Sequence, residues 1–141
     1  MKGIYLLFLH LEGPVKKEIG QLGKINFELG TYIYVGSAQR GIESRVKRHL
    51  REDKRKHWHI DYLLENASVE DMIGYEEKKK EECKTASFLE RKFKKIEGFG
   101  CSDCRCDSHL FHSKRNLENI IDSIREFKGE EDLRLRAFES Q

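Results

Sequence analysis

The sequence lacks a long uninterrupted hydrophobic run, so it contains no candidate for a membrane-spanning helix. It also lacks a basic segment followed by an apolar one near its start, which is the pattern of a secretory signal. Internal repeats and low-complexity linkers are absent from its 141 residues, a length typical of one domain. We therefore predict a cytoplasmic protein that folds as one domain and has no membrane partner.

Cysteine is scarce, with four residues, and an excess of either charge sign is missing. Because cytoplasmic thiols stay reduced, we expect these cysteines to be free or to bind a metal, and not to form disulfides. The 27 Lys and Arg residues nearly cancel the 25 Asp and Glu residues, which leaves a net charge of +2. The overall charge therefore does not by itself predict a nucleic-acid partner.

Positive charge is nevertheless concentrated between Arg40 and His59, where eight Lys or Arg residues face three acidic ones. Clustered positive charge is typical of a phosphate-binding surface, although a solvated helix face has the same composition. The residues that we expect to contact nucleic acid are Arg40, Lys47, Arg48, Arg51, Lys56 and His59.

Hydrophobic periodicity predicts an α+β fold in which helices flank a small, mostly antiparallel sheet. The expected strands are residues 3–11, 15–19, 24–27, 31–36, 69–75 and 108–112. The expected helices follow residue 41, cover residues 58–65 and 81–96, and begin after a Ser113 cap. The tail from Gly129 onwards has no clear pattern.

The first expected helix places a basic residue and a histidine beside its buried stripe. Ile42, Val46 and Leu50 share one helical face and define that stripe. Arg45 and His49 lie next to each other on its border. A guanidinium at the edge of a core suits an anion such as phosphate, although a snorkelling arginine and a hydrogen-bonded core histidine fit the same pattern.

Glu82 opens a later helix and falls on the same face as Ala86, Leu89 and Phe93. A carboxylate in the middle of an apolar stripe requires a partner, and a divalent cation is one candidate. The alternative is a frayed first turn that leaves Glu82 in solvent.

These residues belong to a longer series of motifs. The motifs are Gly3-Ile4-Tyr5, Tyr34-Val35-Gly36-Ser37-Ala38, Arg45-Val46-Lys47-Arg48-His49-Leu50, His57-Trp58-His59-Ile60-Asp61-Tyr62-Leu63, Glu82-Cys83, and the segment from Gly98 to Phe111. In this order they resemble the GIY-YIG nuclease superfamily, and in particular a largely archaeal branch catalogued as a domain of unknown function. Some members of that branch are fused to DNA-repair glycosylases.

The resemblance implies a metal-dependent endonuclease that cuts DNA, for example branched, nicked or damaged DNA in repair or recombination, with a DNA-repair protein as a further partner. It implies catalytic roles for Tyr5, Tyr34, Arg45, His49 and Glu82. Tyr5 or Tyr34 would orient or deprotonate water, Arg45 would stabilise the phosphate, and His49 would assist proton transfer or position a tyrosine. Glu82 would hold Mg²⁺ or Mn²⁺.

Two departures from the superfamily pattern stand out. The long interval between Tyr5 and Tyr34 predicts an inserted hairpin at about residues 13–28, within a nuclease-like domain of residues 1–112. Residues 113–141 would form a C-terminal helix and tail packed on the same domain. The asparagine that closes many superfamily sites has no match, since Asn116 opens a helix, and the Ser108-His109 segment is the candidate for its place.

The cysteine-rich segment has several interpretations. Cys83, Cys104, Cys106 and His109 offer the sulphur and nitrogen ligands of a structural zinc site. Their irregular spacing favours reduced cysteines packed beside the helix. In a third interpretation, Asp103, Asp107 and His109 contribute side chains to the active site.

The sequence is therefore compatible with three functions. They are a DNA endonuclease, a catalytically inactive nucleic-acid-binding module on the same scaffold, and a structural zinc protein that binds other proteins. The basic residues between 40 and 59 support the second function, because phosphate contacts alone can supply such binding.

Overall fold

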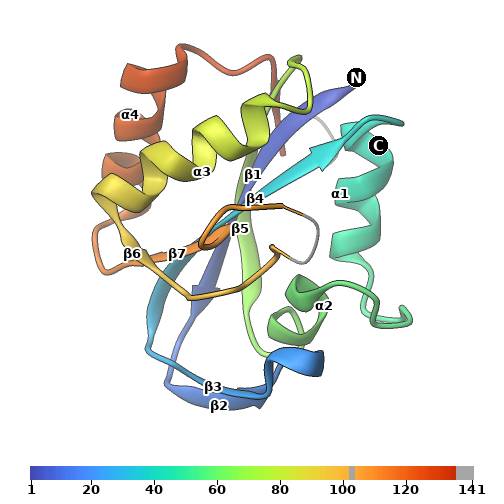
Figure 1. Ribbon diagram of the computed structural model, residues 1–141, viewed down its shortest axis with the longest axis vertical. Coiled ribbons are helices and arrows are strands. Elements are labelled where there is room, and N and C mark those ends of the chain that lie inside the picture. The colour runs from blue at the N-terminus through green and yellow to red at the C-terminus, as the bar shows by residue number, and fades with distance from the viewer. Residues whose placement is uncertain (102–103, 136–141) are drawn as a thin grey trace.

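A six-stranded antiparallel sheet forms the centre of the protein in a computed structural model that describes residues 1–101 and 104–135. The strand order is β6-β7-β4-β1-β5-β8 (Figure 1). The strands are β1 (Gly3–Leu11), β4 (Gly30–Ala38), β5 (Ser68–Tyr75), β6 (Lys94–Lys95), β7 (Leu110–Ser113) and β8 (Leu133–Arg134). The helices are α1 (Ile42–Leu50), α2 (His59–Leu63), α3 (Glu81–Lys92) and α4 (Leu117–Lys128). The predicted α+β class is confirmed.

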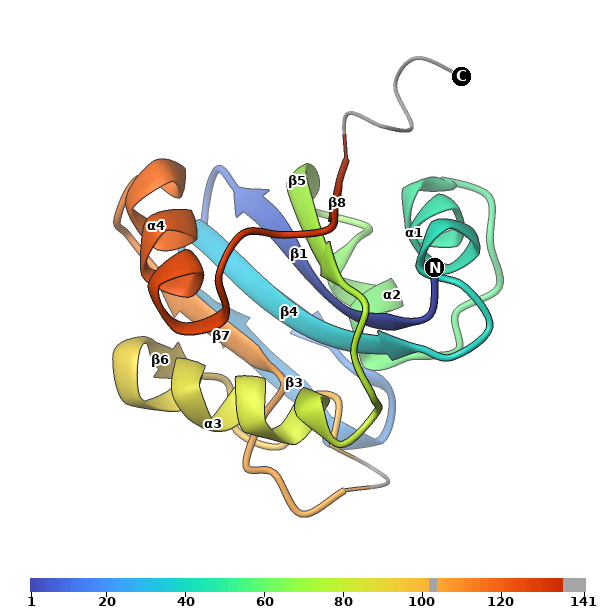
Figure 2. The same cartoon turned by 90° about the horizontal axis from the view of Figure 1, so that it is seen from above.

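The two central strands are buried on both faces, which explains their nearly continuous apolar sequence. Alternate side chains of β1 and β4 enter two separate cores. One core contains Tyr5 and Tyr34 and is covered by α1 and α2, whereas the other contains Ile4 and Val35 and is covered by α3 and α4 (Figure 2). The sheet therefore forms the middle of a three-layer arrangement.

A two-stranded hairpin lies between β1 and β4, within the predicted range of residues 13–28. Strands β2 (Val15–Glu18) and β3 (Lys24–Phe27) form a separate two-stranded antiparallel sheet, joined through a short 3-10 helix at Gly20–Leu22. It lies at one end of the molecule (Figure 1), so the insertion leaves the register of β1 with β4 intact.

Two predicted helix boundaries are wrong. Helix α3 ends at Lys92 and not at residue 96, because Lys94 and Lys95 pair with β7 and gain ladder hydrogen bonds instead. The last helix is capped by Asn116, whose side chain accepts a hydrogen bond of 2.9 Å from the amide of Asn119. Ser113, the predicted cap, belongs to β7.

The predicted buried stripe of α1 is wrong at one position. Leu50 is 43% exposed, whereas His49 is 2% exposed. The helix ends at Leu50, and its inner face follows the spacing of Ile42, Val46 and His49. His49 therefore lies inside the core and not on its border.

Among the described residues, no helix has both the length and the apolar character that crossing a membrane would require.

Candidate active site

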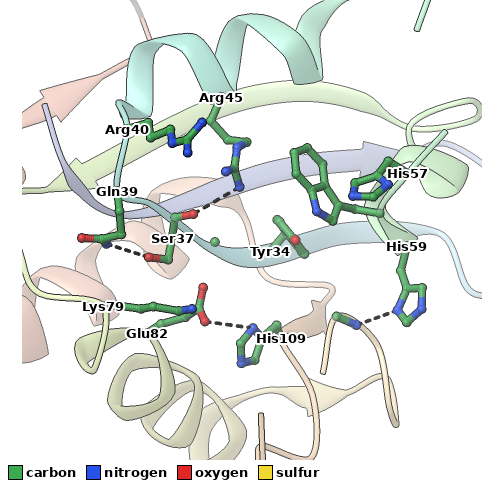
Figure 3. A pocket seen from close by; sticks show the side chains of 13 residues that line it. Tyr34, Ser37, Gln39, Arg40, Arg45, His57, His59, Lys79, Glu82 and His109 are labelled. Carbon is green, nitrogen blue, oxygen red and sulfur yellow. Dashed lines mark hydrogen bonds and ion pairs between the residues drawn. The ribbon is translucent and has the colours of Figure 1, made fainter. Parts of the chain in front are cut away.

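A cavity of about 580 Å³ opens where β4, α1, the start of α2 and the start of α3 meet. Its lining residues are Tyr34, Gly36, Ser37, Gln39, Arg40, Arg45, His57, Trp58, His59, Lys79, Glu82, Gly100 and His109 (Figure 3). Arg40, Arg45 and Lys79 supply positive charge, and Glu82 is the one carboxylate among the described residues that line the cavity. The cavity is therefore suited to an anionic ligand.

Of the five residues predicted to be catalytic, Tyr34, Arg45 and Glu82 line this cavity. Tyr5 and His49 lie behind it, with their ring centroids 6.4 and 6.1 Å from that of Tyr34. The structure thus brings all five into one neighbourhood, although they come from β1, β4, α1 and α3.

Tyr5 approaches the cavity floor because its cross-strand partner is glycine. Gly36 pairs with Tyr5 in the register of β1 and β4. A Cβ atom on Gly36 would lie 2.3 Å from Cζ and 2.5 Å from the hydroxyl of Tyr5. The absence of a side chain therefore lets the Tyr5 hydroxyl reach the backbone that lines the cavity.

Tyr5 and His49 form a buried hydrogen bond of 2.7 Å between the hydroxyl and Nε2. Burial lowers the pKa of His49 from 6.5 to about 3, so its imidazole is neutral near pH 7. Burial also raises the pKa of Tyr5 and of Tyr34 above the ordinary value of 10.0, although the Arg45 guanidinium opposes this increase. Both phenols are therefore protonated near pH 7, and the hydrogen bond to His49 holds the Tyr5 hydroxyl in place.

Arg45 is held at the cavity by two contacts. Its guanidinium donates a hydrogen bond of 3.2 Å to the carbonyl of Ser37 and lies 4.4 Å from the ring centroid of Trp58. The Arg48 guanidinium contacts the same indole at 4.2 Å. Trp58 thus contacts both arginines of α1, a role beyond the helix docking that we predicted from the sequence.

The buried Asp61 carboxylate holds Arg48 and the backbone next to Trp58 in place. Its carboxylate is fully buried and accepts two hydrogen bonds of 2.9 Å from Arg48. It also accepts the backbone N–H groups of His57 and Trp58 at 2.8 and 2.9 Å. These bonds hold the pKa of Asp61 below 3.8, although burial alone would raise it.

Glu82 begins α3 with a side chain that is 15% exposed. It lines the cavity, so the alternative of a fully solvated first turn does not apply. Mg²⁺ in proteins commonly keeps several waters and binds one or two carboxylates together with substrate phosphates. A single inward carboxylate beside a cationic cavity fits that donor set.

The predicted nucleic-acid-binding residues divide into two groups. Arg40 and His59 line the cavity, and His59 also accepts the amide of Gly100 at 2.9 Å. Arg48, Arg51 and Lys56 line a neighbouring basic depression that shares His57 with the cavity. Lys47 is exposed on α1. Their role in binding nucleic acid stays a prediction.

Cys83, Cys104, Cys106 and His109 form a cluster in which all four ligand atoms lie within 4.8 Å of one another. The cluster could hold a metal ion, and its thiol-rich donor set fits zinc and not magnesium or manganese. The fold brings these irregularly spaced residues together, so their spacing along the sequence does not count against a metal site. Burial raises the pKa of the Cys83 and Cys106 thiols.

The structure places only one of the two described residues of the third interpretation, His109, at the cavity. His109 lines the cavity, and its backbone lies beside β4, where its carbonyl accepts the amide of Val35 at 2.9 Å. Asp107 instead pairs with Lys95 at 2.9 Å and is not a lining residue. Asp103 lies outside the described residues.

Sequence reasoning missed Lys79 as a lining residue of the cavity. It belongs to the run Lys78–Lys80 before α3, which reads as an ordinary solvated turn. The one available signal was its position three residues before Glu82.

A family model described as Domain of unknown function DUF123 matches residues 4–130 of the chain. No curated protein and no solved structure matches it.

Proposed function

The chain belongs to the family described as Domain of unknown function DUF123, and we propose that it is a metal-dependent endonuclease that hydrolyses DNA phosphodiester bonds. The resemblance of its motifs to the GIY-YIG nuclease superfamily supports this proposal. The observation that carries it is the convergence of Tyr34, Arg45 and Glu82 on one cationic cavity. These residues are distant in sequence, and no packing requirement alone accounts for their meeting at a solvent-accessible site.

Arg45 binds the scissile phosphate in this proposal. Its guanidinium is oriented by Ser37 and Trp58, so little reorganisation is needed when negative charge develops on the phosphate. Arg40 and Lys79 add positive charge around the same cavity. Tyr34, with a protonated hydroxyl, donates a hydrogen bond to a phosphate oxygen.

Glu82 is the residue that would hold Mg²⁺ or Mn²⁺ at the scissile phosphate. The bound ion would neutralise charge on the phosphate and stabilise the leaving oxygen. The metal preference of the cavity therefore differs from that of the thiol-rich cluster, because carboxylate oxygen suits a hard cation.

Tyr5 and His49 orient the attacking water in this proposal and do not take its proton. The Tyr5 hydroxyl is held by its 2.7 Å hydrogen bond to Nε2 of His49 and stays protonated, because burial raises its pKa. Burial also lowers the pKa of His49 to about 3, so the imidazole is too weak a base to remove the phenol proton near pH 7. The proton of the attacking water therefore leaves through the solvent in the cavity.

The test is cleavage of single-stranded, nicked, flapped and abasic DNA with Mg²⁺ or Mn²⁺. Glu82→Ala and Arg45→Ala should each reduce cleavage by about 100-fold or more. Glu81→Ala is the matched control, because Glu81 lies on the same turn and pairs with Lys84 outside the cavity. The proposal fails if the parent cuts none of these substrates, or if Glu82→Ala cuts as well as Glu81→Ala.

The second candidate function is a nucleic-acid-binding module without catalysis. The observation that favours it is that no asparagine is found among the described residues that line the cavity, whereas many superfamily sites have one. This function requires DNA binding that survives both Arg45→Ala and Glu82→Ala, with no cleavage by the parent.

A further inference from the structure

The thiol-rich cluster has the dimensions of a tetrahedral zinc site. Zinc bonds of about 2.3 Å to sulphur and 2.1 Å to nitrogen place neighbouring ligand atoms roughly 3.5 to 3.8 Å apart. Cys104 Sγ and His109 Nε2 are separated by 3.5 Å, and all four ligand atoms lie within 4.8 Å of one another. Little movement is therefore needed for a zinc ion to be bound.

The cluster joins two parts of the chain that also form a wall of the cavity. Cys83 lies in the first turn of α3, whereas the other three ligands follow β6 in sequence. Glu82, which precedes Cys83 in the sequence, and the ligand His109 both line the cavity. The described residues of this loop, 101 and 104–107, belong to no helix or strand, so a bound metal ion would tie the loop to α3 through Cys83.

His109 contacts the cluster and the catalytic carboxylate with its two different nitrogens. Nε2 faces Cys104, and Nδ1 lies 3.9 Å from Oε1 of Glu82 (Figure 3). The ring is 3% exposed, and the backbone of His109 is fixed by bonds to Phe99 and Val35. A metal on Nε2 leaves the proton on Nδ1, on the side of the ring that faces the carboxylate.

We propose that Cys83, Cys104, Cys106 and His109 bind one structural Zn²⁺ ion, and that His109 connects this ion to Glu82 and thereby orients Glu82 in the cavity. Zinc binding itself is independent of the proposed nuclease function, whereas the purpose of the link rests on that function. Three thiols lose their protons when the ion binds. In this arrangement His109 is a positioning residue and the zinc ion takes no part in the cleavage.

The zinc site is tested on protein purified without chelators or added zinc. Mass spectrometry should find about one zinc per chain, and replacement by Co²⁺ should give the visible absorption of a tetrahedral thiolate complex. Cys106→Ser should lose the metal. Cys101→Ser is the matched control and should retain it, because the Cys101 thiol donates to the carbonyl of Phe99 and is not in the cluster.

Near-zero zinc in the parent together with no tetrahedral cobalt spectrum overturns the site. Retention of zinc by Cys106→Ser, or its loss from Cys101→Ser, overturns the ligand assignment. The parent cobalt spectrum decides the matter even if Cys106→Ser does not fold.

The link to Glu82 is tested by zinc competition with a chromophoric chelator. Glu82→Gln should weaken zinc binding by about 10-fold, since a carboxylate beside the other nitrogen of a metal-bound histidine contributes that much to affinity. Glu81→Gln should bind zinc like the parent. Equal zinc affinity of the two variants overturns the link. This result is separate from cleavage, so an inactive parent with the 10-fold effect supports the inference while refuting the nuclease.

Discussion

His49 is a neutral histidine in the core, and its surroundings determine what it can do. Burial lowers its pKa to about 3, and its Nε2 is hydrogen-bonded to the Tyr5 hydroxyl. Within the part of the chain that the structure describes, its Nδ1 is buried and lacks a hydrogen-bond partner. An imidazole with so low a pKa stays neutral and is a weak base, so it can position the Tyr5 hydroxyl but does not remove its proton.

The buried His49 should make the protein less stable in acid. The unfolded chain binds a proton at His49 below pH 6.5, whereas the folded protein does so only near pH 3, so stability falls as pH decreases through this window. From pH 7.5 to pH 5 the free energy of unfolding should drop by about 2 kcal/mol on this account. Urea denaturation at both pH values measures it.

His49→Gln is the control for this pH effect, since glutamine does not titrate. It should remove most of the difference between pH 7.5 and pH 5, although His59, whose pKa burial also lowers, still contributes in the same direction. An unchanged pH slope in His49→Gln would show that other groups cause it.

At the level of elements, Asp61 holds two helices together. It is the third residue of α2 and binds both the backbone that precedes this helix and the Arg48 side chain of α1. The same contact keeps Arg48 against Trp58, which in turn contacts Arg45. The buried carboxylate of Asp61 thus stabilises the position of Trp58, and through it that of the Arg45 guanidinium at the cavity.

Asp61→Ala should lower the free energy of unfolding by about 3 kcal/mol, because it leaves buried donors and a partly buried guanidinium without their acceptor. Glu65→Ala is the matched control. Its carboxylate pairs with Lys17 and Lys56 at an exposed site, so its removal should cost less than about 1 kcal/mol. Denaturant titration of both variants measures the contrast, and equal losses would contradict the role of Asp61.

For the molecule as a whole, positive charge runs from the cavity to the neighbouring depression. Arg40 and Arg45 line the first, while Arg51 and Lys56 line the second, and His57 lines both. A nucleic-acid backbone that enters the cavity can therefore continue along a basic surface. The net charge of +2 does not show this asymmetry, although Glu82 in the cavity and Asp53 in the depression are acidic.

Arg40→Ala should weaken DNA binding equally for all sequences and reduce the slope of log affinity against log salt by about 0.9, as expected for one lost phosphate contact. Lys24→Ala removes an exposed cation from β3, far in sequence from the cavity, and should leave the slope unchanged. Fluorescence anisotropy over a salt series gives both slopes. Equal slopes for Arg40→Ala and the parent would exclude the cavity as the binding surface.

Local sequence was sufficient where periodicity and propensity agreed. The long apolar runs of β1 and β4 and the spacing of Ile42 and Val46 are properties of single segments, so their structures could be predicted. The end of α3 and the exposure of Leu50 could not, because they depend on partners elsewhere in the chain. Lys94 and Lys95 are not helical because they pair with β7 as a short strand.

The sequence by itself determined the α+β class and the two short strands between β1 and β4, because both follow from local patterns of apolar and turn residues. It also contains the motifs that carry the family resemblance. Only the tertiary structure decided that Tyr34, Arg45 and Glu82 share a cavity and that Cys83 meets Cys104, Cys106 and His109. The physical reason is that chain reversals, which spacing along the sequence does not measure, bring these side chains together. His109 illustrates this most clearly, since its place between the thiols and Glu82 exists only in the folded protein.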